Sequence, residues 1–252
     1  MRNKKKIIFS KYFSKYFIRS KNGRIVLTYH SLNSIINNLT TDIYQLDPFF
    51  FIDHLNYIKN KKFISRNFSD LYNSENGILL TFDDGYKNFL RNGMDKILEY
   101  NLNSIIFICP RLVKENNPHY LNKQDLKEIS QYKNIEIGSH SNDHVNLTNL
   151  NKKDLTYQLE SSKKWLEDSL SINVNKISYP FGGYNQRVID AAKNLFYEKA
   201  FTTRFDFFHK NYDDFQIPRV DIWRNDDKEI FSLKLKGKWN WMRYFNKYNY
   251  IK

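Results

Sequence analysis

The sequence of 252 residues contains a single cysteine and no long uninterrupted apolar run. Cys109 alone cannot form an internal disulfide, and its place at the end of the apolar run 105–109 predicts a small core residue rather than a catalytic thiol. Without an apolar stretch of transmembrane or signal-peptide length, we expect no membrane span, no conventional secretion and therefore a cytoplasmic protein. The sequence also lacks internal repeats and linkers rich in Gly, Ser or Pro, which favours one domain.

Acidic residues are scarce relative to basic ones. The chain has 40 Lys and Arg against 27 Asp and Glu, a formal net charge of +13 at pH 7. This balance favours an anionic partner, and three classes fit it: nucleic acid, phospholipid head groups, or an acidic or phosphate-linked glycan. Composition alone does not distinguish these three classes. The hydrophobic content of 41% and the aromatic content of 17% exclude a disordered chain.

Basic and aromatic residues alternate at both ends of the chain. In residues 1–22, aromatic residues from Phe9 to Phe17 recur every three and four residues among lysines. This pattern is typical of a helix at a membrane surface, here the inner face of the cell membrane, and a solvated basic tail is the alternative. In residues 234–252, the same mixture suits a membrane interface, glycan stacking, single-stranded nucleic acid or a packed C-terminal helix. We expect a central domain of residues 23–233 between the two segments.

Apolar periodicity predicts strands and helices in alternation. Such alternation is typical of parallel strands with helices packed outside them, and it indicates an α/β fold of barrel size. The predicted strands are Arg24–Ser31, Ile78–Leu80, Ser104–Cys109, Ile135–Ile137, Lys176–Tyr179 and Ala200–Thr203, and the predicted helices are Pro48–Lys61, Tyr86–Tyr100, Lys123–Tyr132, Lys152–Leu170 and Gln186–Lys199.

Two adjacent carboxylates end one of these strands. The apolar run Ile78–Leu80 continues into Thr81-Phe82-Asp83-Asp84-Gly85, where Gly85 suits a tight turn into the next helix. Ionised groups at the end of a buried strand are costly unless they are paired, hydrogen-bonded or bound to a metal. Partners for Asp83 and Asp84 are therefore expected elsewhere in the chain.

Two further polar clusters follow strands in the same way. His140 and His144 come after the strand that ends at Ile137, and on a helical turn residues four apart share a face, about 5–6 Å apart at Cβ. Two such imidazoles and a nearby carboxylate would bind a metal ion and leave a position open. Because Asp83 and Asp84 end another strand, a metal site is favoured over the alternative that the two histidines are surface or core residues. The third cluster, Tyr179–Gly183, opens a Gly-rich turn that can direct backbone N–H groups inward, or is an ordinary loop.

In order and spacing, TFDDG at 81–85, HSNDH at 140–144 and YPFGG at 179–183 resemble the successive motifs of the polysaccharide deacetylase family, the NodB-homology or carbohydrate esterase family 4 proteins. The resemblance covers roughly residues 25–223, and the third motif departs from the family's usual form. It implies an irregular (β/α) barrel, with fewer strands than a regular eight-fold one, and a divalent metal ion, usually Zn²⁺, at the carboxyl ends of the strands.

The same resemblance implies roles for individual residues. Asp83 corresponds to the general base, and Asp84 corresponds to a metal ligand alongside His140 and His144. Phe181 stands where the family uses a backbone N–H to hold the oxyanion, and a main-chain donor survives the change from Tyr to Phe.

The proton donor is where the sequence departs from the common family pattern. The family's usual general acid lies near the C-terminus, but no histidine follows His209. His30, in the segment LTYH, resembles the N-terminal Tyr-His motif of the poly-N-acetylglucosamine deacetylase branch, which supplies the acid there. His209 is the competitor, and a structural histidine is the other interpretation of His30. Arg219 corresponds to the arginine that holds the base, although a surface ion pair is also compatible with the sequence.

The motifs predict a metal-dependent N-deacetylase acting on an N-acetylated amino sugar, such as N-acetylglucosamine, in a surface polysaccharide or its lipid-linked precursor. That substrate class comes from the resemblance. The alternatives are a deformylase of an undecaprenyl-phosphate-linked amino sugar and an inactive barrel that binds glycan at a membrane surface. Retention of a base and a complete ligand set weighs against the inactive barrel. Nucleic-acid binding is supported only by charge, and we do not expect it.

Overall fold

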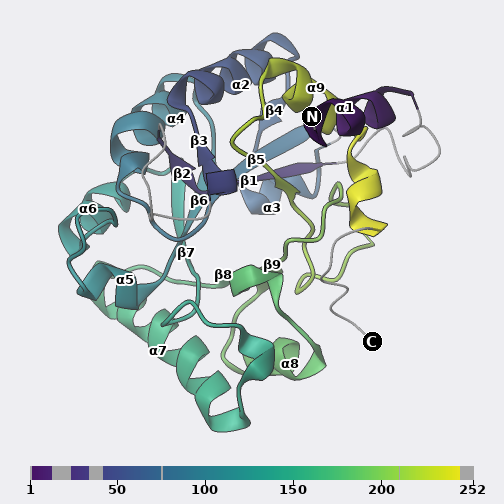
Figure 1. Cartoon of the computed structure of the whole chain (residues 1–252). Coiled ribbons are helices and arrows are strands. Elements are labelled where there is room, and N and C mark those ends of the chain that lie inside the picture. The colour runs from purple at the N-terminus through teal and green to yellow at the C-terminus, as the bar shows by residue number, and fades with distance from the viewer. Residues whose placement is uncertain (1, 13–23, 34–41, 75, 210, 245–252) are drawn as a thin grey trace.

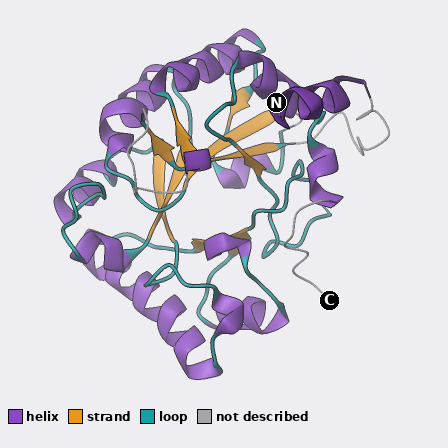
Figure 2. Ribbon diagram, viewed as in Figure 1, coloured by secondary structure: helices purple, strands orange, loops and turns teal. Residues whose placement is uncertain are grey.

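The computed structural model describes residues 2–12, 24–33, 42–74, 76–209 and 211–244. Within them, a curled parallel sheet lies inside a ring of helices (Figures 1 and 2). The sheet contains eight strands in the order β10-β1-β5-β6-β7-β8-β9, with β4 paired to β5 outside this path. The α/β class and the irregular barrel expected from the sequence are therefore confirmed.

The strands of this sheet follow the apolar runs of the sequence. The two-residue strands β4 and β10 escape prediction, because two residues are too few to show an alternation. The bounds are β1 (Ile25–Tyr29), β4 (Ile64–Ser65), β5 (Gly77–Phe82), β6 (Ser104–Ile108), β7 (Ile135–Ser139), β8 (Lys176–Ser178), β9 (Lys199–Phe201) and β10 (Val220–Asp221).

The five predicted helices are present in whole or in part, whereas the helices Phe68–Leu71, Pro110–Lys114 and Lys228–Leu235 are not among the predicted ones. Helix α7 (Lys152–Leu170) has the predicted bounds because the Asn151 side chain caps its first turn. The predicted helix from Tyr86 is wrong in its first part: Tyr86 forms a β-bridge, and a π-helical turn (Leu90–Met94) precedes α4. The other helices are α1 (Arg2–Tyr12), α2 (Pro48–Asn60), α3 (Phe68–Leu71), α4 (Asp95–Glu99), α5 (Pro110–Lys114), α6 (Lys123–Ile129), α8 (Gln186–Asn194) and α9 (Lys228–Leu235).

The predicted helix Gln186–Lys199 is also too long. Helix α8 ends at Asn194, and Lys199 already belongs to β9. Phe196 lies between them with a left-handed φ of 59°, a conformation that a helix cannot continue through.

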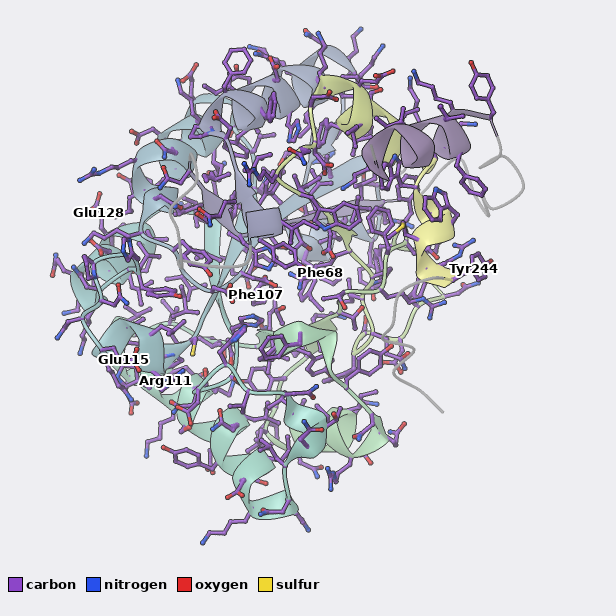
Figure 3. The ribbon with its side chains drawn as sticks, viewed as in Figure 1. Phe68, Phe107, Arg111, Glu115, Glu128 and Tyr244 are labelled. Atoms are coloured by element: carbon purple, nitrogen blue, oxygen red, sulfur yellow. The ribbon has the colours of Figure 1, made fainter. Side chains whose placement is uncertain are left out.

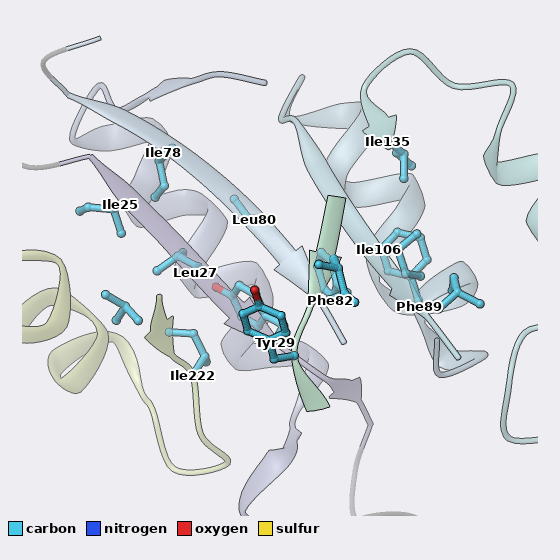
Figure 4. Packing of buried hydrophobic residues seen from close by; sticks show 14 of the residues in the cluster. Ile25, Leu27, Tyr29, Ile78, Leu80, Phe82, Phe89, Ile106, Ile135 and Ile222 are labelled. Carbon is cyan, nitrogen blue, oxygen red and sulfur yellow. The ribbon is translucent and has the colours of Figure 1, made fainter. Parts of the chain in front are cut away.

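Strands β1, β5, β6 and β9 separate two apolar layers. Val26, Leu79 and Phe107 form one layer with Phe68, and Figure 3 shows Phe68 and Phe107 near the centre of the molecule. Leu27 and Leu80 belong to the other layer, between the strands and the helices (Figure 4). Because side chains alternate along a strand, the inward series from Val26 continues to Thr28 and His30, and that from Leu79 continues to Thr81 and Asp83. The interior thus becomes polar toward the carboxyl ends of the strands.

The described part of the C-terminal segment packs onto this core. Trp239 and Trp241 are only 2% and 8% exposed, so neither side chain faces outward as an interfacial helix would require. The Trp241 indole donates a hydrogen bond to Ser10 Oγ (2.9 Å) and packs against Phe9 of α1. Packing is therefore the alternative observed for residues 234–244, while residues 245–252 and the aromatic residues 13–17 lie outside the described residues. No described helix has both the length and the apolarity to span a membrane.

A buried ion pair fastens this segment to the barrel. Asp206 accepts hydrogen bonds from Arg243 Nη1 (2.6 Å), the Tyr212 hydroxyl (2.7 Å) and Asn240 Nδ2 (3.1 Å). The Asp206 and Arg243 side chains are 2% and 4% exposed. A charge buried this deeply depends on its partner, because water cannot replace it.

We predict that Asp206→Ala destabilises the protein strongly, because Arg243 would stay buried without its counter-charge. Breaking a buried pair from one side costs about 3–5 kcal/mol, measurable as the loss in free energy of unfolding in urea. Asp168→Ala, on the exposed face of α7, should change that free energy by less than about 0.5 kcal/mol. Equal effects of the two substitutions would contradict the prediction.

Candidate metal centre and active site

The polar residues singled out in the sequence meet at one edge of the sheet. Asp83 and Asp84 directly follow β5, His140 follows β7 and His30 follows β1. Arg219 instead precedes β10, and its long side chain reaches Asp83. Because the paired strands of the sheet are all parallel, their carboxyl ends lie on the same side. The barrel thereby gathers residues that are far apart in the sequence.

Asp84, His140 and His144 form a candidate metal centre. Their ligand atoms all lie within 4.8 Å of one another, and Asp84 Oδ1 is 3.3 Å from His140 Nε2 and 3.1 Å from His144 Nε2. These contacts do not have hydrogen-bond geometry, and Asp84 Oδ1 is a buried oxygen without a hydrogen-bond partner among the described residues. One carboxylate and two imidazoles are the donor set of many catalytic zinc sites. The three residues therefore fit a shared divalent cation.

The ring of His140 is oriented by the neighbouring strand. Its Nδ1 lies 2.7 Å from the backbone oxygen of Ser178, the last residue of β8. A carbonyl only accepts, so Nδ1 carries the proton and Nε2 presents its lone pair toward Asp84. Such a second contact fixes both the tautomer and the direction of a metal-binding histidine.

The loop that carries both histidines is not the helical turn expected from their spacing. Residues 140–146 form no helix, and Ser141 and His144 have left-handed φ values of 59° and 53°. Asp84 is also left-handed, with φ at 72°. Non-glycine residues in this region cost about 1–3 kcal/mol each and gather at functional sites. The convergence of the ligands therefore comes from backbone kinks rather than from a helix face.

Surrounding side chains hold this loop in place. Gln158 of α7 accepts from the Asp143 backbone N–H (2.9 Å) and donates to Asp143 Oδ2 (2.6 Å). Buried Cys109 donates from Sγ to the Asn142 carbonyl (2.9 Å). Burial raises the pKa of the Cys109 thiol to about 11, which leaves it protonated at neutral pH and agrees with the predicted core role.

Arg219 holds the other carboxylate of the pair. Its Nη1 and Nη2 donate to the two oxygens of Asp83 at 2.8 and 2.7 Å, and Ser178 Oγ donates to the same carboxylate at 3.1 Å. Arg219 is fully buried, so the pair is not the surface contact considered as an alternative. Parallel bidentate bonds of this kind are among the strongest charge-assisted contacts.

The two adjacent acids therefore have different electrostatic environments. Burial alone would raise the pKa of Asp83, but Arg219 and His140 outweigh it and lower this pKa to about 2. Burial likewise acts against ionised Asp84, yet its contacts with His140 and His144 hold its pKa well below the usual value. Both carboxylates are thus ionised at neutral pH. Asp83 faces an arginine, whereas Asp84 faces two histidines.

The structure separates the two candidate proton donors. His30 is half-buried at the carboxyl end of β1, where burial lowers its pKa and Asp84 and Asp83 act against that shift. His209 follows Phe208, which pairs with Arg24 just before β1 begins. The six residue-to-residue steps from Arg24 to His30 span about 20 Å of extended chain. His209 therefore lies toward the opposite end of the barrel.

Phe181 stands beside the candidate metal centre. Its ring packs edge-on against His144 with centroids 4.7 Å apart, and its side chain is 52% exposed. Phe181 and Gly182 both have left-handed φ values, 58° and 68°. A Cβ at Gly182 would lie 2.0 Å from Thr203 Oγ1, so only glycine fits this turn.

Several residues of the site are not apparent from the sequence. Ser178 contacts both Asp83 and His140. The only signal in the sequence is strand alternation, which places the Ser178 side chain on the same face of the predicted strand 176–179 as Lys176. Asp221 is a further buried carboxyl near Arg219, and burial raises its pKa to about 6 despite the attraction of Arg219 and Lys234. No local pattern distinguishes Asp221, because its neighbours come from the barrel rather than from adjacent residues.

The fold and the site together define a curled (β/α) barrel with a carboxylate-histidine-histidine centre and a separate, arginine-held carboxylate. The family model for polysaccharide deacetylases matches residues 71–200, more than half of the 252 residues. The chain belongs to the polysaccharide deacetylase family.

Individual relatives agree with this assignment. The Bacillus subtilis (strain 168) protein YxkH, named after the same family, is 31% identical over 130 residues, 52% of this chain and 46% of its own length. A poly-beta-1,6-N-acetyl-D-glucosamine N-deacetylase of Staphylococcus aureus (strain MRSA252) is 26% identical over 181 residues, 68% of this chain and 59% of the relative. The chain thus spans about half the length of the curated relatives it matches.

A solved structure shows the same fold. The Streptococcus pyogenes deacetylase PplD, in complex with acetate, superposes with a TM-score of 0.77 at 19% identity, covering 86% of this chain and 99% of that one. At 19% identity this similarity is evidence for the fold alone.

We predict that the protein binds one divalent ion and that its affinity rises with pH. Burial lowers the pKa of His140, but Asp83 and Asp84 outweigh it and raise the pKa, so protons compete for Nε2 as the pH falls. Calorimetric titration with Zn²⁺ in buffers of different ionisation enthalpy should show proton release. Asp84→Ala should abolish binding, whereas Glu128→Ala, at the periphery in Figure 3, should not. A Zn²⁺ affinity that changes neither with pH nor in Asp84→Ala would contradict the proposed site.

Proposed function

We propose that this protein is a metal-dependent N-deacetylase that hydrolyses the acetamide of an N-acetylated amino sugar. The observation that carries the proposal is the division between two adjacent acids: Asp83 lies in the fork of Arg219, and Asp84 faces His140 and His144. Amide hydrolysis needs both a proton acceptor for water and a site that polarises the carbonyl. A barrel that only bound glycan would need neither.

Asp84, His140 and His144 would hold the cation. When bound there, a divalent ion would polarise the acyl carbonyl and make water a stronger acid. Asp83 is the base that takes the proton from water as the water oxygen bonds to the acyl carbon. Its low pKa keeps it ionised throughout the physiological range, at the expense of basicity. The Arg219 fork also keeps its oxygens aimed into the site.

The leaving nitrogen has to be protonated as the C–N bond breaks, so that an amine rather than an amide anion departs. We assign this step to His30, because Tyr29 pairs in register with Phe82 and the Asp83 backbone N–H donates to the Tyr29 carbonyl (3.0 Å), so that His30 and Asp83 lie side by side at the ends of their strands. A lowered pKa makes its protonated form a stronger acid. We assign the backbone N–H of Phe181, next to His144, to the oxygen of the carbonyl under attack. The products are acetate and the free amino sugar.

One relative supports the substrate class. The Staphylococcus aureus relative is a poly-beta-1,6-N-acetyl-D-glucosamine N-deacetylase, which supports N-acetylglucosamine or a close analogue in a polysaccharide as the substrate. A lipid-linked precursor stays a prediction from the sequence. The net charge of +13 suits a glycan that carries acidic or phosphate groups.

Mass spectrometry of the products tests this proposal. Zn²⁺-loaded protein is incubated with N-acetylglucosamine oligomers, with a lipid-linked N-acetylated sugar and with their N-formyl analogues, and loss of a single acyl group is sought. We expect removal of acetyl groups, and none by chelator-treated protein. Removal of formyl groups alone would instead make the protein a deformylase. Intact substrates with fully metal-loaded protein would overturn hydrolysis on these sugars.

Asp83→Asn should retain metal while losing turnover. The substitution keeps an oxygen that accepts from Arg219 but removes the charge that accepts a proton, and general-base help is worth about 10²–10⁴-fold. Asp84→Asn should weaken Zn²⁺ binding instead. Elemental analysis and rates measured on the same preparations separate the two effects, and equal loss of metal from both variants would show that the roles are assigned wrongly.

His30→Ala should lose roughly 10²–10⁴-fold in turnover while keeping its fold and metal, because the departing amine would lack a proton donor. His209→Ala is the matched control, since His209 lies near the other end of β1. It should change turnover little. A larger loss from His209→Ala than from His30→Ala would transfer the role to His209.

A further inference from the structure

Tyr44 lies against the ring of His30. The two ring centroids are 4.2 Å apart, and the ring planes are inclined by 30°. His30 Nδ1 is buried and has no hydrogen-bond partner among the described residues. Catalytic histidines are usually oriented by a hydrogen bond to the ring nitrogen that does not react. His30 Nδ1 makes no such hydrogen bond within the described residues, and the ring instead contacts the aromatic ring of Tyr44.

Backbone pairing places the two rings in register. Tyr44 ends the 3₁₀ turn η2 (Asp42–Tyr44) and precedes β3 (Gln45–Leu46), which pairs in parallel with β2 (Ser31–Leu32). Ser31 is the register partner of Gln45, so His30 and Tyr44 occupy equivalent positions one residue earlier. Neighbouring strands lie about 4.7–4.9 Å apart, a separation at which side chains in register meet face to face.

The small sheet itself is held firmly. Asn88 accepts from the Leu32 backbone N–H (3.0 Å) and donates to Ser31 Oγ (2.7 Å), and Asn92 donates to the Leu32 carbonyl (2.7 Å). The four residues of the two strands are buried, each 2% exposed or less. The contact therefore belongs to a fixed frame rather than to a mobile loop.

We propose that Tyr44 is a positioning residue that sets the orientation of the His30 ring and so aims its proton at the leaving nitrogen. This inference rests on the proposed function. Tyr44 acts through its ring contact with His30 and does not itself move a proton. A donor misplaced by about 1 Å costs about 10²-fold in rate.

Two substitutions and two substrates test this role. Tyr44→Leu removes the aromatic face, and Tyr44→Phe keeps it. An N-acetylated sugar needs a protonated leaving group, whereas 4-nitrophenyl acetate releases a stable anion that needs no proton. We expect Tyr44→Leu to lower kcat on the amide about 10²-fold with little change in KM or in ester hydrolysis, and Tyr44→Phe to retain most of the amide rate. Phe49→Leu, a nearby exposed aromatic at 67% exposure, is the control and should behave as wild type.

A second measurement does not depend on turnover. A stacked tyrosine shifts the proton resonances of a neighbouring imidazole through its ring current, and His30→Ala identifies those resonances in a histidine-labelled spectrum. We expect the shift to persist in Tyr44→Phe and to vanish in Tyr44→Leu. The spectrum thus tests the contact between Tyr44 and His30 even if the protein proves inactive on acetylated sugars. Such inactivity would contradict the proposed function and not the contact.

Three outcomes would overturn the inference. Equal loss of amide and ester hydrolysis in Tyr44→Leu would indicate a structural role. A change confined to KM would place Tyr44 against the sugar. Unchanged His30 resonances in Tyr44→Leu would show that the two rings are not in contact in solution.

Discussion

The buried pair of Asp83 and Arg219 is the interaction on which the rest of the site depends. Arg219 also donates to Thr81 Oγ1, Ser178 Oγ and the Thr202 carbonyl, and thus joins β5, β8 and the chain after β9. A buried ion pair offsets its desolvation only when the remaining donors and acceptors are satisfied, as they are here. The same contacts bridge the side of the barrel where β9 and β10 do not pair as neighbours. One guanidinium thereby supports the barrel and holds Asp83 apart from the candidate metal ligands.

Strand direction explains why the chemistry lies at this edge. Inward positions recur every second residue, so an apolar interior ending in Leu79 and Val26 turns polar at Thr81, Asp83 and Thr28 as the strands reach their carboxyl ends. The left-handed residues of the site lie just past those ends, where the backbone is free of the sheet's hydrogen bonds. Strain and function coincide there because the packed barrel beneath holds the turns in place.

The sequence predicts those parts of the site that lie within short motifs. TFDDG and HSNDH each bring their residues together locally, and the apolar runs and the cap at Asn151 determine most element bounds. Phe181, in contrast, can be placed beside His144 only in the folded chain. The left-handed conformation of Ser141 and His144 was not predicted, because two histidines four residues apart suggest a helical turn and the sequence shows no sign of the backbone kinks. Tyr44 and Asp221 escaped it because their neighbours are set by strand pairing between distant segments, which one sequence does not reveal.

In the proposed mechanism the two adjacent acids have separate roles: Asp84 binds the metal ion, and Arg219 holds Asp83 away from it. A crystal structure of the Zn²⁺-loaded protein, with the ion located by anomalous scattering at the zinc edge, tests this directly. We expect an ion bonded to Asp84, His140 and His144, with both oxygens of Asp83 still in the fork of Arg219. An ion coordinated by Asp83, or one bound away from His140 and His144, would contradict it.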